Sequence, residues 1–277
     1  MKVAIQGQQG SYHHQAALGF FGAEISLVGC NTFKETFLAL KNKKADFAVA
    51  AIENSLFGSI NQTYDLLLQN DFAICGEAYL RIEHCLIGLP GTQLSDIKEV
   101  HSQLEALAQC DNYLDDNLPG AERIEQHDTA ASVETIKELN DPSTAAIASR
   151  QAAQLHGLKI LQKNIEDNKE NYTRFVVITS DKAKVTDANK ASLVLTTGSD
   201  TRPGALHKAL EVFAKLGINM TLLHSRPVIG KAWHYMFYVD IETSLETPPG
   251  NAVLPELSKL GYDVEVLGNY PAGKKEI

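Results

Sequence analysis

The chain has 277 residues, of which 44% are hydrophobic and 21% are charged, and its formal net charge is −9. A chain of this length has room for about two domains with buried cores. The net negative charge argues against nucleic-acid binding, which needs clustered Lys and Arg to neutralise phosphates. No stretch approaches about 18 apolar residues, and the apolar run at the N-terminus is too short for a secretory signal. We therefore expect a cytoplasmic protein without a membrane span.

Residues that could hold a metal or form disulfides are scattered along the chain. The nine histidines include no His-Glu-x-x-His pattern, and the His13-His14 pair has no cysteine or carboxylate at metal-ligand spacing. The four cysteines include no Cys-x-x-Cys pair, and without an export signal we expect reduced thiols. The sequence therefore predicts neither a metal site nor a cofactor.

The N-terminal part of the chain alternates between strand-like and helix-like segments. In chain order, the patterns predict a strand at 2–6, helices at 12–20 and 32–40, a buried strand at 47–52 and a helix at 61–68. Thr32 is the expected N-cap of the second helix. Strand–helix alternation of this kind predicts a mostly parallel sheet that is covered by helices.

A second α/β segment begins near residue 74. Here the patterns predict a strand at 79–87, helices at 103–113 and 129–139, and a strand at 144–148, with Thr129 as the cap of the second helix. A further strand at 174–178 would return the chain to the first segment. Two lobes joined by crossing strands would enclose a cleft, which is a common place for a small-molecule site.

The last part of the chain has the element order of a ferredoxin-like fold. Residues 180–190 are polar and predict a linker. Beyond it we expect a strand at 191–197, a helix from 202 to 216, strands at 218–223 and 233–241, a helix at 253–260 and a strand at 262–267. Gly217 is the expected stop of the first of these helices. The order is βαββαβ.

Several segments resemble motifs of one enzyme family. The run Thr173-Arg174-Phe175, at the start of a predicted strand, resembles the Thr-Arg-Phe signature of prephenate dehydratases. Segments similar to other motifs of that family occur in the same order at 7–12 (GQQGSY), 52–60 (IENSLFGSI) and 106–110 (ALAQC). Residues 204–206 (GAL) and 225–227 (SRP) are similar to the two short motifs of its regulatory ACT domain. The resemblance extends from about residue 3 to residue 270.

The resemblance implies a fold and a division of the chain. It implies an α/β protein in which a two-lobed, periplasmic-binding-protein-like (type 2) catalytic domain is followed by a ferredoxin-like ACT domain. We place the catalytic domain at 1–180, with lobe one at about 1–75 plus 165–180 and lobe two at about 76–164. We place the ACT domain at 191–270. Because the first strand starts at Lys2, we expect no preceding chorismate mutase segment and hence no bifunctional enzyme.

The resemblance also implies an activity. A prephenate dehydratase is a carbon–oxygen lyase that converts prephenate into phenylpyruvate, carbon dioxide and water in L-phenylalanine biosynthesis, without a cofactor. The resemblance further implies that phenylalanine binds the ACT domain as a feedback inhibitor, and that the protein is a homodimer or a homotetramer. The expected partners are therefore small molecules, with no nucleic acid and no membrane.

The Thr-Arg-Phe run supplies the candidate catalytic residues. Thr173 is assigned to the leaving hydroxyl, by hydrogen bonding or proton donation. Arg174 has a planar guanidinium that can bind a carboxylate through two parallel hydrogen bonds. Phe175 can provide an apolar surface against the ring of the substrate. The structural alternatives are a strand start for Thr173, a surface ion pair for Arg174 and a core side chain for Phe175.

Four more residues are candidates for binding the anionic substrate. Asn54 and Ser55 follow the buried strand, whose carboxyl end should open into a crevice. Ser11 follows the glycine-rich turn at the start of a helix, which suits a carboxylate. Gly58 either allows close backbone approach or makes a simple turn. Glu53 would repel a dianion, so we expect it to bond to the backbone or to a basic residue.

The candidate effector site combines the start of a helix with the end of a strand. Its residues are Gly204, Ala205, Leu206, Ser225, Arg226 and Pro227. Helix-start N–H groups can bind the carboxylate of an amino acid, and the resemblance implies phenylalanine bound between two such domains of a dimer. His207 and His224 depart from the family motifs, and histidines that titrate near neutrality would make inhibition sensitive to pH.

Other departures and alternatives leave the substrate open. Gln103, Leu104 and Glu105 stand where the family shows His, Pro and Gln. One alternative substrate is arogenate, the amino analogue of prephenate, which an acidic residue facing the amino group would favour. The other alternative is a non-catalytic amino-acid sensor, and an intact Thr173-Arg174 pair argues against it.

Overall fold

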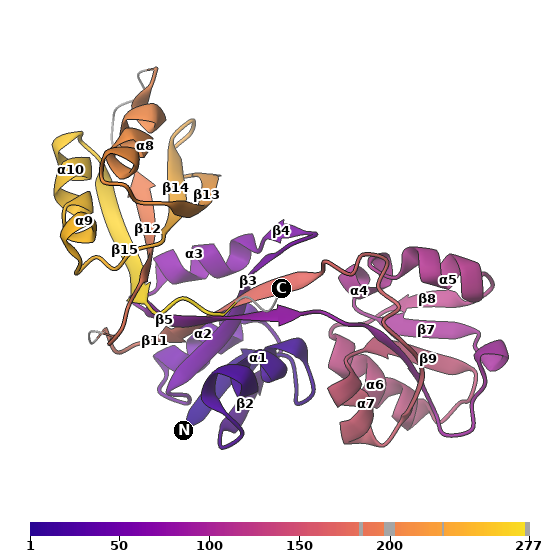
Figure 1. Cartoon of the computed structure of the whole chain (residues 1–277). Coiled ribbons are helices and arrows are strands. Elements are labelled where there is room, and N and C mark those ends of the chain that lie inside the picture. The colour runs from indigo at the N-terminus through magenta and orange to yellow at the C-terminus, as the bar shows by residue number, and fades with distance from the viewer. Residues whose placement is uncertain (183–184, 197–202, 229, 275–277) are drawn as a thin grey trace. The chain divides into compact units, whose positions relative to one another are not determined.

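The computed structural model describes residues 1–182, 185–196, 203–228 and 230–274. These residues form two compact units, which we call the first unit (Met1–Thr63 and Ala78–Phe175) and the second unit (Tyr64–Glu77 and Val176–Lys274). Three elements contribute residues to both units and can be followed in Figure 1: α3 (Asn61–Gln69), β5 (Ala73–Arg81) and β11 (Tyr172–Thr179). Among the described residues, no helix has the length and hydropathy that crossing a bilayer requires.

Lobe one of the first unit is built on a largely parallel sheet. Its strands are β1 (Lys2–Gln6), β2 (Ser26–Cys30), β3 (Phe47–Asn54), the short β4 (Gly58–Ser59) and the first residues of β11. They lie in the order β11-β3-β1-β2, with β4 on β3, and β1 pairs in parallel with both of its neighbours. Helices α1 (Tyr12–Phe21) and α2 (Phe33–Lys41) connect these strands. The Thr32 hydroxyl accepts from Glu35 N, which confirms the predicted cap.

Lobe two has a sheet of its own with helices on both faces. The strands are β6 (Cys85–Gly88), β7 (Glu99–Ser102), β8 (Glu122–Glu125), β9 (Thr144–Ala148) and β10 (Lys159–Lys163), in the order β10-β6-β9-β7-β8. Alternate residues of β6 and β9 pack against α4 (Leu104–Ala108) and α5 (Asp111–Asn117) on one face. The others pack against α6 (Thr129–Leu139) and α7 (Arg150–His156), and Figure 1 shows these two helix pairs on opposite sides of the sheet. A short 3₁₀ turn, Leu94–Asp96, precedes β7.

Lobe two departs from the predicted elements in three ways. The strand predicted at 79–87 is two strands, because residues 82–84 form the crossover between the lobes. The helix predicted at 103–113 is split into α4 and α5. The predicted cap of α6, Thr129, is wrong: Asp128 is the N-cap, and its Oδ1 accepts from the backbone N–H groups of Ala130 and Ala131.

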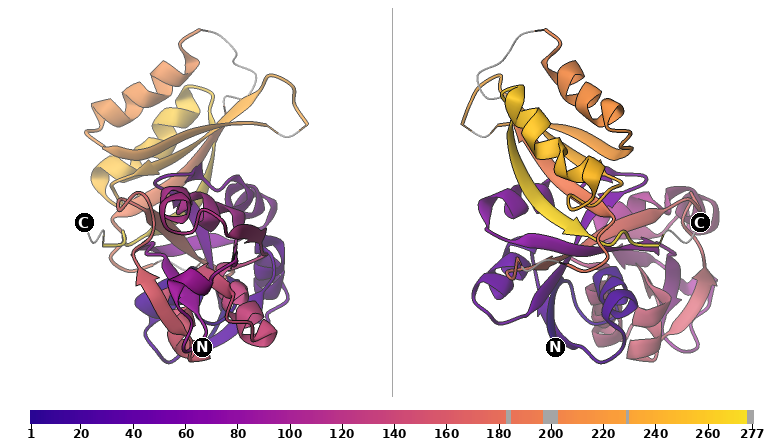
Figure 2. Two further views of the ribbon diagram at one scale, coloured as in Figure 1. Left: turned by 90° about the vertical axis from the view of Figure 1, so that its right-hand side faces the viewer. Right: turned by 60° about the vertical axis from the view of Figure 1, so that its left-hand side comes forward.

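The second unit contains the predicted ferredoxin-like order. Its elements are β12 (Lys190–Thr196), α8 (Ala205–Lys215), β13 (Met220–Pro227), β14 (Tyr235–Ile241), α9 (Pro248–Asn251), α10 (Val253–Lys259) and β15 (Asp263–Tyr270). The strand order is β13-β14-β12-β15. Apolar residues of α8 and α10 form one core cluster with residues of β12 and β14, and Figure 2 shows these helices in orange and yellow. The predicted helix start at Arg202, the end of the predicted strand at Thr197 and residues 183–184 of the predicted linker lie outside the described residues.

Candidate functional site

A cavity of about 320 Å³ lies between the two lobes of the first unit. Lobe one lines it with residues of β1, α1, β3, β4 and β11. Lobe two lines it with residues between β5 and β6, with residues at both ends of α4 and with residues at the start of α6. The predicted site residues that line the cavity are Ser11, Asn54, Gly58, Thr173 and Phe175. The fold therefore brings together at one place five of the seven residues that were predicted to act in catalysis or substrate binding.

The glycine-rich turn before α1 lets the two lobes approach each other. Gly7 and Gly10 both have a φ of +91°, which L side chains rarely adopt. A Cβ on Gly7 would lie 2.5 Å from Asp128 Oδ2, and a Cβ on Gly10 would lie 3.0 Å from Ala152 Cα. Ser149 Oγ donates to the Gly10 carbonyl at 2.7 Å. Glycine is required here by both the backbone conformation and the space.

We expect Gly7→Ala to harm the protein more than Gly22→Ala. Gly22, at the end of α1, has a φ of +81° with no atom within 4 Å of an added Cβ. A positive φ costs each variant about 1–3 kcal/mol of unfolding free energy, but only Gly7→Ala also displaces Asp128. Urea unfolding and the turnover of each variant are the measurements. Equal losses in the two variants would contradict a close approach of the lobes at Gly7.

Asn54 fixes the orientation of the Thr173 hydroxyl. Asn54 Oδ1 accepts from the backbone N–H groups of Leu56 and Phe57, each at 3.0 Å. Since a backbone N–H can only donate, the other end of the amide must be the NH₂ group. Asn54 Nδ2 then donates to Thr173 Oγ1 at 2.9 Å and to Asn171 Oδ1 at 2.9 Å. Because Thr173 Oγ1 is the acceptor in this bond, its own proton is available to a group inside the cavity.

The same chain of hydrogen bonds continues into lobe two. Asn171 Nδ2 donates to Gln109 Oε1 at 2.8 Å, and that oxygen lies 2.7 Å from His84 Nε2. His84 Nε2 must therefore carry a proton. Burial lowers the pKa of His84, although its bond to Gln109 opposes the decrease, so the ring is neutral and Nδ1 is bare. The Tyr12 hydroxyl lies 2.9 Å from His84 Nδ1 and also 2.9 Å from the Glu83 carbonyl oxygen, so its one proton is shared between two acceptors. One continuous set of bonds thus runs from α1 through lobe two to Thr173.

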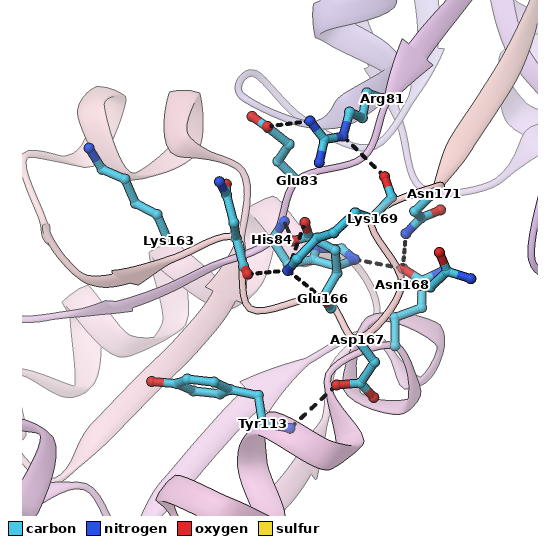
Figure 3. Close-up of polar contacts among 12 residues, drawn as sticks. Arg81, Glu83, His84, Tyr113, Lys163, Glu166, Asp167, Asn168, Lys169 and Asn171 are labelled. Atoms are coloured by element: carbon cyan, nitrogen blue, oxygen red, sulfur yellow. Dashed lines mark hydrogen bonds and ion pairs between the residues drawn. The ribbon is translucent and has the colours of Figure 1, made fainter. Parts of the chain in front are cut away.

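The segment that leads into β11 is held by a set of polar contacts (Figure 3). Glu166 is only 1% exposed, and its Oε2 accepts from His84 N at 2.9 Å. Lys169 Nζ donates to the carbonyls of Asn164 and Glu166 at 2.5 and 2.6 Å. The Asp167 carboxylate accepts from two backbone N–H groups at the start of α5, one of them that of Tyr113. These contacts set the course of the chain up to Asn171, and so they position the start of β11.

Arg174 is placed on the other face of β11. It lies between Thr173 and Phe175, so strand alternation turns its side chain away from the cavity that they line. The side chain is 4% exposed, and Nη1 lies 3.9 Å from Glu53 Oε2. This agrees with the expectation that Glu53 faces a basic residue. The cavity's lining gives no support to the predicted clamping of a substrate carboxylate by Arg174.

Ser55 and Gly58 have backbone roles here. The Ser55 hydroxyl donates to the Glu170 carbonyl at 2.6 Å and accepts from Tyr172 N at 2.9 Å. Ser55 N donates to the Tyr172 carbonyl at 2.8 Å. These bonds join the end of β3 to the start of β11, and Ser55 does not line the described cavity. Gly58 lines it with a φ of +76° and open space at its Cβ position, which favours the turn role over close approach.

No lysine or arginine is among the described residues that line the cavity. Its titratable groups are Tyr12, His13, His84, Glu105 and Asp128. Burial raises the pKa of Asp128, although bonds from two backbone N–H groups oppose the increase. Burial also holds the pKa of Tyr12 well above its ordinary value. An anion in this cavity therefore has to be bound by neutral donors. In the described chain, no group of three His, Cys, Asp or Glu side chains is placed to hold a metal ion.

The candidate effector residues all belong to the second unit. Gly204 is the N-cap of α8 with a φ of +84°, and Ala205 and Leu206 form the first turn of that helix. The other motif residues, Ser225, Arg226 and Pro227, end β13. Arg226 Nη2 donates to both carboxylate oxygens of Asp65, at 2.8 and 2.7 Å. The Arg226 guanidinium is thus already paired with a residue of α3.

The sequence analysis assigned no role to three of the cavity residues that the hydrogen bonds connect: Tyr12, His84 and Gln109. Tyr12 and Gln109 lie inside segments that resemble family motifs, so the motifs pointed to their neighbourhood without giving them a role. His84 lies in a segment that reads as an ordinary strand. Its partners are 72 and 25 residues away in sequence, and no local pattern records such pairs.

Comparisons with known proteins agree on one family. The family model described as "Prephenate dehydratase" matches residues 3–183, and the model described as "ACT domain" matches residues 193–254. The "Bifunctional chorismate mutase/prephenate dehydratase" of Aquifex aeolicus (strain VF5) is 40% identical over 271 residues, which are 98% of this chain and 74% of that protein.

Solved structures are similar over nearly the whole chain. The structure of prephenate dehydratase from Arthrobacter aurescens in complex with L-Phe has a TM-score of 0.88 at 30% identity, and covers 98% of this chain and 90% of that one. A structure described as "GqqA- a novel type of quorum quenching acylases" also has a TM-score of 0.88, at 34% identity, and covers 98% of each chain.

Proposed function

The chain belongs to the prephenate dehydratase family, and from this premise we propose that it converts prephenate into phenylpyruvate, carbon dioxide and water in the cavity between its lobes. Loss of the ring carboxylate and the ring hydroxyl makes the ring aromatic, which drives the reaction. The hydroxyl leaves with negative charge developing on its oxygen and takes up a proton to become water. The task left to the protein is to hold the dianion and to stabilise the departing oxygen.

The orientation of Thr173 is the observation that carries this proposal. Its Oγ1 accepts from Asn54 at 2.9 Å, so its hydroxyl proton can be donated to the departing oxygen. A threonine hydroxyl is a weak acid, and its effect must come from a hydrogen bond that strengthens as charge develops. Phe175, on the same face of β11, supplies an apolar surface for the forming aromatic ring.

Incubation of the purified protein with prephenate tests the proposal. We expect phenylpyruvate to appear, with a kcat in the range of ordinary enzymes, about 1–10³ s⁻¹. Heat-denatured protein measures the spontaneous reaction. No phenylpyruvate above that background would contradict the proposed activity, and it would favour the amino-acid sensor.

Arogenate is a second candidate substrate because two acidic side chains, Glu105 and Asp128, line the cavity. A carboxylate of the protein near the amino group of arogenate would stabilise that positive charge. Prephenate has no positive charge to offset the repulsion between this carboxylate and its own carboxylates. Parallel assays with arogenate and prephenate compare the two kcat/KM values. A Glu105→Gln variant is expected to lower the value for arogenate more than the value for prephenate if Glu105 faces the amino group.

An acylase activity has less support in this cavity. Amide hydrolysis by a hydroxyl nucleophile needs that hydroxyl beside a general base. Among the described residues of the lining, the Ser11 hydroxyl accepts from His14 N, and the Thr173 hydroxyl accepts from Asn54. Neither contact supplies a base. Tyr12, 2.9 Å from His84 Nδ1, is a lining hydroxyl beside a possible base, but the Glu83 carbonyl competes for its proton at 2.9 Å.

We propose that phenylalanine regulates the enzyme through residues 204–206 and 225–227. An effector carboxylate that uses Arg226 has to compete with Asp65, which holds the guanidinium in the described structure. Asp65→Asn should therefore lower the phenylalanine concentration needed for inhibition by about fivefold or more, and Arg226→Gln should raise it by a similar factor. Turnover without phenylalanine is expected to stay close to that of the parent. Identical inhibition curves for the parent and both variants would contradict the competition.

The two histidines of the effector motifs extend this proposal. His207 is exposed, and the His224 ring lies 6.0 Å from the Tyr64 ring. Protonation of either would change the charge beside a bound amino acid. Phenylalanine inhibition at pH 6 and at pH 8.5 is expected to differ, and coincident curves would contradict a role for these histidines.

The remaining features of the proposal concern assembly and location. We propose a homodimer or a homotetramer, a cytoplasmic location, a catalytic domain at 1–180 and a regulatory domain at 191–270. Sedimentation gives the oligomeric state, and fractionation of cells gives the location.

Limited proteolysis tests the division into a catalytic and a regulatory domain. The first cut is expected within 180–190.

A further inference from the structure

His13 has one ring nitrogen bound to the backbone, and its side chain lines the cavity. It lies in the first turn of α1. Its ring packs edge-on against two phenylalanine rings, with centroid distances of 5.0 Å to Phe175 and 5.6 Å to Phe33. This packing fixes the plane of the imidazole, and so it fixes the direction in which each ring nitrogen points.

A backbone amide of β3 determines which nitrogen carries the proton. The pairing of β3 with β1 ends at Val49 and Ile5, so the amide of Ala51 lies beyond the last paired residue of β1. Ala51 N lies 3.2 Å from His13 Nε2 and donates to it. Because a backbone N–H can only donate, Nε2 must be unprotonated. Burial lowers the pKa of His13 to about 3, so the ring is neutral near pH 7 and its proton is on Nδ1.

The Nδ1–H group has no hydrogen-bond acceptor among the residues that the structure describes. Nδ1 is not among the buried atoms that lack a partner, so it is accessible, and water or a ligand can accept its hydrogen bond. His13 lines a cavity with room for a small molecule. The group is thus a fixed, uncharged donor that lacks only an acceptor, and an oxygen of a bound ligand can supply one.

We propose that His13 Nδ1–H donates a hydrogen bond to a carboxylate oxygen of the bound substrate, so that a neutral imidazole takes the place of a lysine or arginine. This inference rests on the proposed function. In prephenate the ring carboxylate and the hydroxyl are on opposite ring carbons, so the donors that bind them must be about one ring apart. Thr173 and Phe175 are about 6.6 Å apart along one face of β11, and His13 contacts Phe175.

The electrostatics of the cavity favour a neutral donor. Glu105 and Asp128 are the acidic residues of the described lining, and no lysine or arginine is present there to offset a dianion. A protonated imidazole would have to be desolvated in this apolar position between two phenylalanine rings, which is unfavourable. A neutral N–H donor avoids that cost and keeps its bond strength unchanged over the pH range in which the enzyme works.

Two variants and one control test the role of His13 in substrate binding. His13→Leu removes both nitrogens, and we expect kcat/KM for prephenate to fall by about 10- to 100-fold, mostly through KM, as for a lost bond to a charged group. His13→Gln keeps a neutral acceptor and a neutral donor, and should recover part of the loss. His156→Gln, at the end of α7 and outside the lining, is the control and should match the parent.

Nitrogen-15 NMR of the histidine rings tests the tautomer without relying on activity. We expect His13 to show a protonated Nδ1 and a bare Nε2 from pH 5 to pH 8. These signals come from the His13 ring itself, so they give its tautomer even if Tyr12, His84, Glu105 or Asp128 changes its protonation in this range. An Nε2–H tautomer, or titration of His13 within that range, would overturn the proposal even if His13→Leu failed to fold.

The kinetic outcomes separate this proposal from the function on which it rests. An active parent whose KM is unchanged in His13→Leu would overturn the role of His13 and leave the activity in place. A parent that makes no phenylpyruvate would remove the proposed activity, and with it the substrate carboxylate named here.

Discussion

Replacing Thr173 with valine is expected to lower kcat for prephenate by about 10²–10⁴-fold, which is the usual rate contribution of a positioned proton donor. Valine keeps the shape and branching of threonine and removes only the hydroxyl. The fold should persist, because Asn54 Nδ2 still has the Asn171 side chain and the Tyr172 carbonyl as acceptors, at 2.9 and 3.3 Å. Initial rates of phenylpyruvate formation give the effect.

Thr173→Ser is the matched control. Serine keeps the hydroxyl and its bond from Asn54, so we expect a kcat within about tenfold of the parent. Thermal unfolding of both variants verifies that the fold is intact. A valine variant as active as the serine variant would show that the hydroxyl takes no part in the reaction.

The second large effect is on stability. A cluster of charged residues is buried in the second unit: Lys190 Nζ lies 2.8 Å from Glu77 Oε2 and 3.6 Å from Asp240 Oδ2. Each of these three residues is 4% exposed or less. We expect Lys190→Met to lower the free energy of unfolding by about 3–5 kcal/mol, because methionine fills the space but leaves two buried carboxylates without their cation.

An exposed ion pair of the same unit is the matched control. Lys215 Nζ lies 2.9 Å from Glu211 Oε1 on α8, and both side chains are largely exposed. Lys215→Met should therefore leave the free energy of unfolding almost unchanged. Urea unfolding of the two variants gives the comparison. If Lys190→Met were as mild as Lys215→Met, the buried carboxylates would have to be protonated or otherwise satisfied.

Much of the fold follows from local patterns. The continuous apolar run of β3 and the order of elements after residue 190 predicted the parallel sheet and the βαββαβ unit, both of which are present. The break between β5 and β6 could not be predicted, because it depends on distant partners. Ile82 N donates to the Asn171 carbonyl and Ile165 N to the His84 carbonyl, and these pairs are more than 80 residues apart.

The candidate site was predictable in part. Motif resemblance supplied Ser11, Asn54 and Thr173, which line one cavity. Strand alternation alone separates Arg174 from Thr173: two neighbours on a strand face opposite sides, so both could not line the same cavity. The partners of His84 and the tautomer of His13 depend on hydrogen bonds to residues far away in sequence, and no spacing rule reports them.

A double-mutant cycle on Asn54 and Thr173 tests the central claim most directly, which is that Asn54 makes the Thr173 hydroxyl a donor toward the substrate. Asn54→Asp removes the Nδ2 donor but keeps an oxygen for the N–H groups of Leu56 and Phe57. The Thr173 hydroxyl would then donate to the new carboxylate. We predict that kcat falls in Asn54→Asp, and that the Asn54→Asp/Thr173→Val protein is no slower than Thr173→Val alone. A parental kcat in Asn54→Asp, or two effects that multiply in the double variant, would contradict the claim.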